Sequence, residues 1–373
     1  MQPYTPNSAD SQRAQVDLYA SPAVPALYRQ EDGMAVRCLS CAHCCRIKPG
    51  QRGTCRMRYN SDGTLQAPSG YVAGLQVDPI EKKPFYHVLP GSHALSFGML
   101  GCNFHCDFCQ NWGSSQALRD REARTDFQPC TAGFLVNLAL KYETPSVVST
   151  YNEPFITADW AARVFEQGKE HGLLCGFVSN GYATREVLEF LHPLLDFCNV
   201  DLKCFSEQGY RRLGGGLRPV LDTIEHLVAS RCWVEVVTLV VPGFNDHPGE
   251  LEQCASFLAG LSADIPWHVT AFYPSYKMTN SCPTPPELLE RAWNAGKEAG
   301  LHHVYTGNMA GRMGNRENTY CHGCGTLLIE RRGFRLLQSR VPTGFCPQCG
   351  AGIAGHWHGR NNDTEKKPVP DQI

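Results

Sequence analysis

The chain has 373 residues, a formal net charge of −2 and 19 cysteines. The near-neutral charge argues against a nucleic-acid-binding surface as the main function, and the sequence has no run of 18 apolar residues that would span a membrane. Because no signal-peptide pattern is present, we expect a cytoplasmic protein whose cysteines are reduced and bind metals instead of forming disulfides.

The first 90 residues are predicted to lie outside the main fold. Residues 1–30 are polar and rich in Pro, Ser and Ala, which predicts an irregular arm. Residues 31–90 form a cysteine-rich segment in which C-x2-C-x3-C is followed by a further cysteine. The favoured ligands, with Cys44 as a spare thiol, are Cys38, Cys41, Cys45 and Cys55. This spacing suits Zn²⁺ or a second iron–sulfur cluster, and the alternative is reduced cysteines without a metal.

Residues 91–315 alternate short apolar runs with amphipathic stretches of helical length. The predicted strands are 94–100, 146–150, 173–179, 197–202, 233–241, 267–272 and 303–307. The predicted helices are 131–143, 155–172, 184–195, 219–231, 248–261 and 285–300. Several strands are apolar on both faces, as in a covered parallel sheet. This alternation predicts an α/β fold, specifically a partial or complete parallel (β/α) barrel.

Polar motifs follow the predicted strands at their carboxyl ends. They are "YNEP" (151–154), "NGYAT" (180–184), "DLK" (201–203), "PGFND" (242–246), "YPSYKM" (273–278) and "GNM" (307–309). The carboxyl ends of parallel strands meet at one edge of the sheet, where barrel enzymes build their active sites. Single motifs of this kind are often ordinary turns, but six in register indicate a functional rim.

Three cysteines follow the first predicted strand in the sequence "CNFHCDFC", at Cys102, Cys106 and Cys109. A structural metal site normally closes four ligands around its metal. Three thiolates can hold a [4Fe–4S] cluster and leave one iron free to bind a substrate or cofactor. The missing fourth cysteine therefore indicates a catalytic cluster.

Residues 316–358 contain two C-x2-C pairs, each followed by glycine and separated by a predicted strand pair. The four thiols are those of Cys321, Cys324, Cys346 and Cys349. The pattern predicts a zinc ribbon with a structural role. A rubredoxin-like iron site and a partner-docking surface are the alternatives. Residues 359–373 are predicted to be a disordered tail.

The motifs taken together resemble the radical SAM superfamily, in the branch related to pyruvate formate-lyase-activating enzymes. With the cysteine-rich segment and the ribbon, the chain most resembles the AmmeMemoRadiSam-system radical SAM enzymes. This resemblance implies a [4Fe–4S] cluster that cleaves S-adenosylmethionine (SAM) to a 5′-deoxyadenosyl radical, which then abstracts hydrogen from a substrate. The resemblance does not identify the substrate of the enzyme, which is either a protein or a small molecule.

The resemblance also implies roles for residues of the rim. Cys102, Cys106 and Cys109 would ligate the cluster, and Phe108 would pack against the adenine of SAM. Glu153, with Asn152, would contact the ammonium of the methionine part, although Glu153 could instead be a carboxylate at a helix N-terminus.

Two further pairs complete the predicted site. Ser179 and Asn180 fit the ribose-contacting position, and Asp201 and Lys203 point at the same rim. We assign Lys203 to the SAM carboxylate or the substrate, with a salt bridge at the rim as the alternative.

The resemblance implies partners as well. They are a reductant such as flavodoxin or ferredoxin, and possible AMMECR1-like and Memo-like proteins. Two other functions compete with this hypothesis. One is activation of a glycyl-radical enzyme, and the other is a non-enzymatic iron–sulfur or zinc protein that carries electrons or serves as a scaffold.

Overall fold

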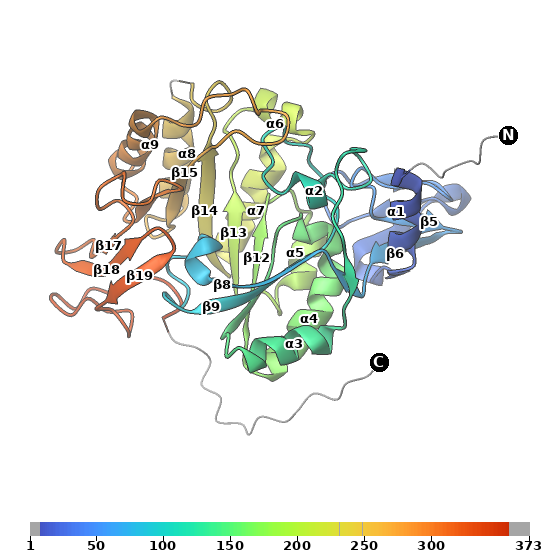
Figure 1. The fold of residues 1–373 in the computed structure, drawn as a ribbon, viewed down its shortest axis with the longest axis horizontal. Helices are drawn as coiled ribbons and strands as arrows, with labels where there is room; N and C mark the ends of the chain where they lie inside the picture. The colour runs from blue at the N-terminus through green and yellow to red at the C-terminus, as the bar shows by residue number, and fades with distance from the viewer. Residues whose placement is uncertain (1–7, 231, 248, 358–373) are drawn as a thin grey trace.

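A computed structural model of the chain describes residues 8–230, 232–247 and 249–357. Its centre is an eight-stranded sheet in the order β16-β15-β14-β13-β12-β11-β9-β8 (Figure 1). The strands are β8 (Gly74–Pro79), β9 (His93–Gly98), β11 (Ser146–Ser149), β12 (Leu174–Ser179), β13 (Phe197–Asp201), β14 (Trp233–Val240), β15 (Trp267–Ala271) and β16 (Val304–Gly307). All neighbours from β9 to β16 are parallel, and β8 pairs with β9 in the antiparallel direction.

The seven predicted strands are therefore present, as β9 and β11 to β16, and their parallel pairing is confirmed. The sheet is open, because β8 and β16 lie at its two ends and are not paired with each other. The curvature of a partial barrel stays a prediction. The antiparallel strand β8 was missed, since it lies in the segment that the sequence assigned to the cysteine-rich region.

Helices connect the parallel strands, and the six predicted ones are found. They are α3 (Ala132–Lys141), α4 (Ala158–Glu170), α5 (Arg185–Leu191), α7 (Leu217–Ala229), α8 (Glu250–Leu261) and α9 (Pro286–Glu298). Two short helices were not predicted, namely α2 (Trp112–Ser115) and α6 (Glu207–Leu213). Thr131, Thr184 and Ser206 begin α3, α5 and α6 by accepting a backbone hydrogen bond, as expected of such residues.

The prediction of an irregular arm over residues 1–30 is wrong for residues 8–30; residues 1–7 lie outside the described part. This segment contains α1 (Ser8–Asp17), β1 (Ala20–Pro22) and β2 (Tyr28–Gln30). β1 pairs with β6 (Thr64–Pro68), and β2 pairs with β3 (Val36–Cys38). Because the strand partners lie downstream, the local sequence carries little signal for them.

The remaining short strands lie mostly around the cysteine-rich segment. β5 (Tyr59–Ser61) pairs with β6, and β4 (Arg46–Ile47) pairs with β3. β7 (Tyr71–Val72) pairs with β10 (Gln128–Pro129). In Figure 1 the helix α1 and the strands β5 and β6 lie at the opposite end of the molecule from β17, β18 and β19.

The C-terminal region contains a small antiparallel sheet of β17 (Thr319–Tyr320), β18 (Leu327–Arg332) and β19 (Arg335–Ser339), with one cysteine pair between β17 and β18 and the other after β19. This sheet is anchored to the loop that precedes β9. Arg331 donates a 2.8 Å hydrogen bond to the carbonyl of Tyr86, and His356 N donates to the carbonyl of His87 at 2.8 Å. The predicted tail 359–373 lies outside the described residues.

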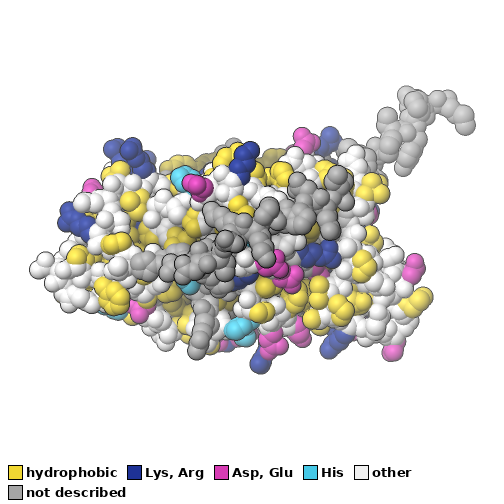
Figure 2. Space-filling view, turned by 90° about the horizontal axis from the view of Figure 1, so that it is seen from below, with side chains coloured by type: hydrophobic (Ala, Val, Ile, Leu, Met, Phe, Trp, Pro, Cys, Tyr) yellow, Lys and Arg dark blue, Asp and Glu magenta, His cyan; other side chains and the backbone are white. Residues whose placement is uncertain are grey.

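In the described part of the chain, no helix is both long and apolar enough to cross a bilayer. Figure 2 shows one face of the molecule, on which Lys and Arg side chains are scattered among Asp and Glu side chains. No large area of one charge stands out among the atoms visible there.

Candidate active site

The three-cysteine loop leaves the carboxyl end of β9 and begins at Gly101. Gly101 has φ +90°, a conformation that glycine adopts readily and other residues rarely adopt. A Cβ at this position would lie 2.2 Å from Cγ of Met57 and 3.3 Å from the carbonyl oxygen of Cys55. Gly101 therefore lets the loop pass close to the N-terminal cysteine-rich segment.

The three thiols are surrounded by groups that suit an iron–sulfur cluster. Sγ of Cys102 accepts from the backbone N–H of Phe104 at 3.4 Å and from the amide of Asn180 at 3.7 Å. Sγ of Cys109 lies 3.2 Å from the hydroxyl of Ser115. Burial raises the pKa of Cys106 to about 12. Hydrogen bonds to the sulfurs and exclusion of water are the usual means of tuning such clusters, so the residues present fit the group.

Glu153 lies at the end of β11 and is almost completely buried. Its Oε1 accepts hydrogen bonds from Ser179 Oγ at 2.8 Å and Phe155 N at 2.9 Å, and its Oε2 accepts from Asn180 N at 2.8 Å. Burial raises the pKa of Glu153 to about 7 despite these donors. The bond from Phe155 caps the 3-10 helix η4 (Pro154–Thr157), so the alternative of a carboxylate at a helix N-terminus also describes this residue.

Asn180 joins this carboxylate to the cysteine loop. Besides its contact with Cys102, its side-chain amide donates a 2.7 Å hydrogen bond to Oδ1 of Asn103. Asn152 has a different setting, because its Oδ1 accepts from Met99 N at 3.0 Å and its amide donates to the carbonyl of Glu153. The side chain of Asn152 thus holds the backbone at the start of the loop.

Lys203 and Asp201 form an ion pair of 2.9 Å at the end of β13. Burial lowers the pKa of Lys203, but the charges of Asp201 and Cys106 outweigh burial, so the pKa is raised. The rim salt bridge weighed from the sequence is therefore present, and the positive charge of Lys203 lowers the pKa of Cys106 against the larger effect of burial. Asn245 of the "PGFND" motif fixes this turn, since its amide donates to the carbonyl of Lys203 at 2.7 Å.

Phe108 is buried and packs against Phe244, also from "PGFND", with ring centroids 5.2 Å apart. The loop after β15 closes on the same region. Ser275 Oγ donates to the carbonyl of Cys109 at 3.2 Å, and Lys277 N donates to the carbonyl of Asp107 at 3.0 Å. Residues from five strand ends therefore meet around the cysteine loop.

Several residues that shape the loop were missed from the sequence. The guanidinium of Arg119 donates to the carbonyls of Phe104 at 2.6 Å, Cys102 at 2.9 Å and Thr54 at 2.9 Å. Gly215 packs so tightly on the loop that a Cβ there would lie 2.3 Å from the ring of Phe104. The run of three glycines at 214–216 was the available signal for this contact, whereas nothing local marks Arg119.

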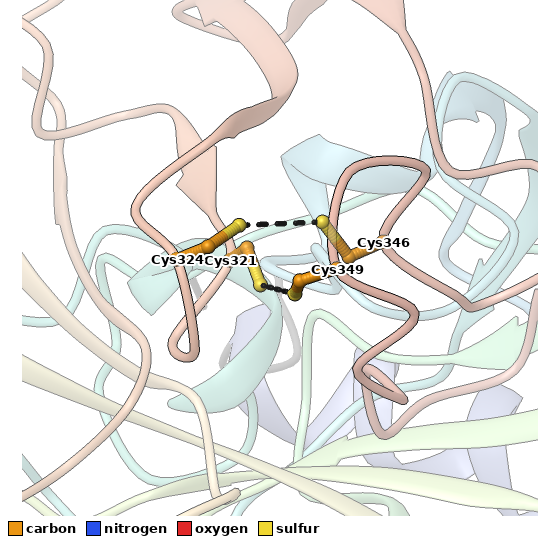
Figure 3. Close-up of side chains that lie close together, drawn as sticks. All are labelled: Cys321, Cys324, Cys346 and Cys349. Atoms are coloured by element: carbon orange, nitrogen blue, oxygen red, sulfur yellow. Dashed lines mark hydrogen bonds between the residues drawn. The ribbon is translucent and has the colours of Figure 1, made fainter.

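The four C-terminal thiols point toward one another (Figure 3). Their sulfurs all lie within 4.8 Å, with Cys321–Cys349 and Cys324–Cys346 each at 3.6 Å. A tetrahedral site with Zn–S bonds of about 2.3 Å has sulfur–sulfur edges of about 3.8 Å. The geometry is therefore that of a mononuclear site, and these four residues could bind a metal ion.

The N-terminal thiols are gathered less tightly. Burial raises the pKa of Cys41, and the charges of Cys38, Cys55 and Cys45 raise it further, so these thiols are neighbours. Among the described residues, the C-terminal set is the group of three or more metal-binding side chains whose ligand atoms lie within 4.8 Å of one another. Neither the N-terminal thiols nor Cys102, Cys106 and Cys109 reach that spacing.

Comparison with known proteins agrees with this geometry. The family model of the radical SAM superfamily matches residues 98–255, which include the three-cysteine loop. The chain is 38% identical over 330 residues to "Uncharacterized protein MJ0808" of Methanocaldococcus jannaschii, covering 87% of this chain and 97% of that protein.

Two solved structures are also similar. A radical SAM methyltransferase from Sphaerobacter thermophilus is 15% identical, over 82% of this chain and 83% of that chain, with a TM-score of 0.44. A domain of pyruvate-formate lyase-activating enzyme from Bacteroides vulgatus is 13% identical, over 40% of this chain and 91% of that chain, with a TM-score of 0.33.

Residues 98–255 match the radical SAM superfamily, and a domain of that superfamily implies an enzyme that uses SAM and a [4Fe–4S] cluster. The chain as a whole belongs to the same family as the M. jannaschii protein, across nearly the whole length of that relative.

Proposed function

We propose that the protein cleaves SAM reductively and uses the resulting radical to abstract hydrogen from a protein or small-molecule substrate. When bound, a [4Fe–4S] cluster would supply the electron for breaking a C–S bond of SAM to give methionine and the 5′-deoxyadenosyl radical. Cys102, Cys106 and Cys109 would hold the cluster. The observation that carries the proposal is the placement of Glu153 and Asn180 beside this loop, linked to Cys102 by hydrogen bonds.

The chain's own residues would bind and orient SAM. Glu153, held by three donors, offers a buried carboxylate to the ammonium of the methionine part. Ser179 and Asn180 lie beside it and would position the ribose. Lys203, kept protonated by Asp201, supplies a cation for a carboxylate of SAM or of the substrate.

Phe108 and Phe244 would exclude water from the site. They form an apolar wall next to the cysteine loop, against which an adenine ring can pack. A closed apolar site would also hold the carbon radical beside its substrate and away from competing C–H and S–H hydrogen donors.

The finer assignments of the protein are also proposals. The motif set and both flanking cysteine clusters support an AmmeMemoRadiSam-system enzyme, with AMMECR1-like and Memo-like proteins as partners and a flavodoxin or ferredoxin as reductant. The 3.6 Å sulfur spacings support Zn²⁺ in the C-terminal ribbon. The high number of free thiols supports a cytoplasmic location.

The proposal is tested by anaerobic reconstitution with iron and sulfide, followed by dithionite and SAM. We expect 5′-deoxyadenosine from the wild type and none from Cys106→Ala, with Cys282→Ala, which changes an exposed thiol, as the control. A wild-type protein that carries iron and leaves SAM intact would contradict the proposal. Candidate substrates are then screened for deuterium transfer into 5′-deoxyadenosine.

A further inference from the structure

The N-terminal cysteines come from β3, from the turn after it and from the segment before β5, and Cys38, Cys41 and Cys55 are buried. Cys38 ends β3, and its N–H donates a 3.0 Å hydrogen bond to the carbonyl of Cys45. The N–H and the hydroxyl of Thr54, the residue before Cys55, both lie 3.3 Å from Sγ of Cys45. Besides burial, Cys38, Cys55 and Cys45 raise the pKa of Cys41, so these thiols are its neighbours.

Cys44 differs from Cys45 in its backbone and in the surroundings of its thiol. Its φ is +43°, and its backbone N–H donates to the carbonyl of Cys41 in a tight turn. Sγ of Cys45, in contrast, has the N–H and the hydroxyl of Thr54 within 3.3 Å. We therefore assign Cys45 to the ligands and Cys44 to the turn.

The four thiols are accompanied by hydrogen-bond donors and by a buried cation. Arg58 is only 1% exposed, and its guanidinium donates to Sγ of Cys38 at 3.6 Å while it pairs with Asp159. Thr54 supplies the donors to Cys45. A [4Fe–4S] cluster with four cysteine ligands carries a net negative charge, and hydrogen bonds to its sulfurs set its potential. A buried arginine beside the thiols suits such a cluster.

The spacing of the thiols favours an iron–sulfur cluster over a single Zn²⁺ at this site. The C-terminal thiols lie within 4.8 Å of one another, as a single Zn²⁺ requires. Among the described residues, neither the N-terminal thiols nor those of Cys102, Cys106 and Cys109 form a group of three within that distance. A polynuclear cluster places several iron atoms between its sulfurs, so it binds thiols that lie farther apart.

The two sets of cysteines share a hydrogen-bonded interface. One nitrogen of Arg119 donates to the carbonyls of both Thr54 and Cys102, each at 2.9 Å. On the other side of the interface, Nε2 of His43 lies 3.0 Å from the carbonyl of Asn103. The close passage of Gly101 past Cys55 adds a third point of contact.

We propose that Cys38, Cys41, Cys45 and Cys55 hold a second iron–sulfur cluster, which passes single electrons to the cluster held by Cys102, Cys106 and Cys109. The second part of this inference rests on the proposed function. A reduced flavodoxin or ferredoxin gives one electron to the N-terminal cluster. That electron then reduces the SAM-binding cluster as the N-terminal cluster is reoxidised, and no proton is transferred in either step.

The first test counts metals after anaerobic reconstitution. We expect about eight iron atoms per wild-type chain and about four in a variant with Cys102, Cys106 and Cys109 all changed to Ala. The triple variant should still give an electron paramagnetic resonance signal after reduction with dithionite. This signal does not require the cleavage of SAM, so the result is independent of the proposed function. A triple variant that holds zinc and no iron would overturn the second cluster.

The second test uses variants of the N-terminal set. Cys41→Ala should leave about four iron atoms, whereas the matched variant Cys44→Ala should keep about eight. If Cys41→Ala fails to fold, the triple variant still decides the question. Equal iron content in Cys41→Ala and Cys44→Ala would contradict the ligand set.

The third test addresses electron transfer. In the dithionite-reduced wild type, two paramagnetic clusters in neighbouring segments should couple, which broadens the resonance signal beyond the sum of the signals from the triple variant and Cys41→Ala. A signal equal to that sum would overturn the relay. A coupled protein that leaves SAM intact would instead contradict the proposed function and retain both clusters.

Discussion

The backbone N–H of Asn180 donates a 2.8 Å hydrogen bond to the carboxylate of Glu153, across the ends of the adjacent strands β12 and β11. The side chain of the same asparagine reaches Sγ of Cys102. One residue therefore links the group expected to bind the ammonium of SAM with a thiol expected to bind the cluster. The predictions below follow from this arrangement and from the packing around it.

Replacing Glu153 with Gln should weaken the binding of SAM. The change removes the carboxylate from a buried site, and a hydrogen bond to a charged group contributes about 1.5–3 kcal/mol, which corresponds to roughly a tenfold to hundredfold rise in Kd. The measurement is equilibrium binding of SAM to reconstituted protein of equal iron content. Glu189→Gln, an exposed carboxylate on α5, serves as the control. Unchanged affinity in Glu153→Gln would exclude contact with the ammonium.

The binding of SAM should release a proton at about pH 6. Burial raises the pKa of Glu153 to about 7, so the carboxyl is mostly protonated below that value. A bound ammonium favours the ionised form, and affinity should therefore rise with pH and level off above about pH 7. Calorimetry in two buffers of different ionisation enthalpy measures the proton. Glu153→Gln should show neither the release nor this part of the pH dependence.

Replacing Gly101 with Ala should destabilise the protein by about 1–3 kcal/mol. The left-handed backbone and the 2.2 Å approach to Met57 both disfavour a Cβ at this position. Thermal unfolding of the reconstituted protein measures the loss. Gly260→Ala is the matched control, because Gly260 lies in α8 with no atom within 4 Å of the added carbon. That control should be neutral or slightly stabilising, and a similar loss in both variants would contradict the role of Gly101.

Replacing Cys324 with Ser should remove one metal ion per chain and lower the melting temperature. Structural zinc contributes about 10–16 kcal/mol of apparent binding energy in small zinc domains, so the ribbon should lose its ordered packing. Elemental analysis identifies the metal, and differential scanning calorimetry measures the stability. The exposed Cys282→Ser is the control. Formation of 5′-deoxyadenosine should persist at moderate temperature, because the described residues that meet around the three-cysteine loop come from the ends of β11 to β15.

The parallel sheet was predictable because each strand is a continuous apolar run followed by its own helix. Runs such as 197–202 and 233–241 are long and unbroken, and tertiary packing only reinforces what their local sequence favours. β8 and α1 were missed for the opposite reason. The strand partner of β8 is β9, and Val16 of α1 is buried by residues far away in the chain, so neither element is marked by its own sequence.

The site was predictable where its chemistry requires one residue type. An iron–sulfur cluster requires closely spaced cysteines, and the ammonium of SAM requires an acidic residue such as the one after β11. Arg119 and Asn103 were not predictable, because they act through hydrogen bonds to backbone carbonyls and to other side chains. Such contacts depend on loop geometry that no spacing in the sequence encodes. Asn152 was assigned to the site from the sequence, but the hydrogen bonds of its side chain to the backbone of Met99 and Glu153 were not predictable.

The anchoring of the loop before β9 by residues near the far end of the chain has a consequence for biosynthesis. Tyr86 and His87 receive hydrogen bonds from Arg331 and His356. A ribosome must therefore synthesise the chain as far as His356 before this early loop can form all of these contacts. Truncation before the last cysteine pair would leave a distant, early part of the protein without the contact from His356.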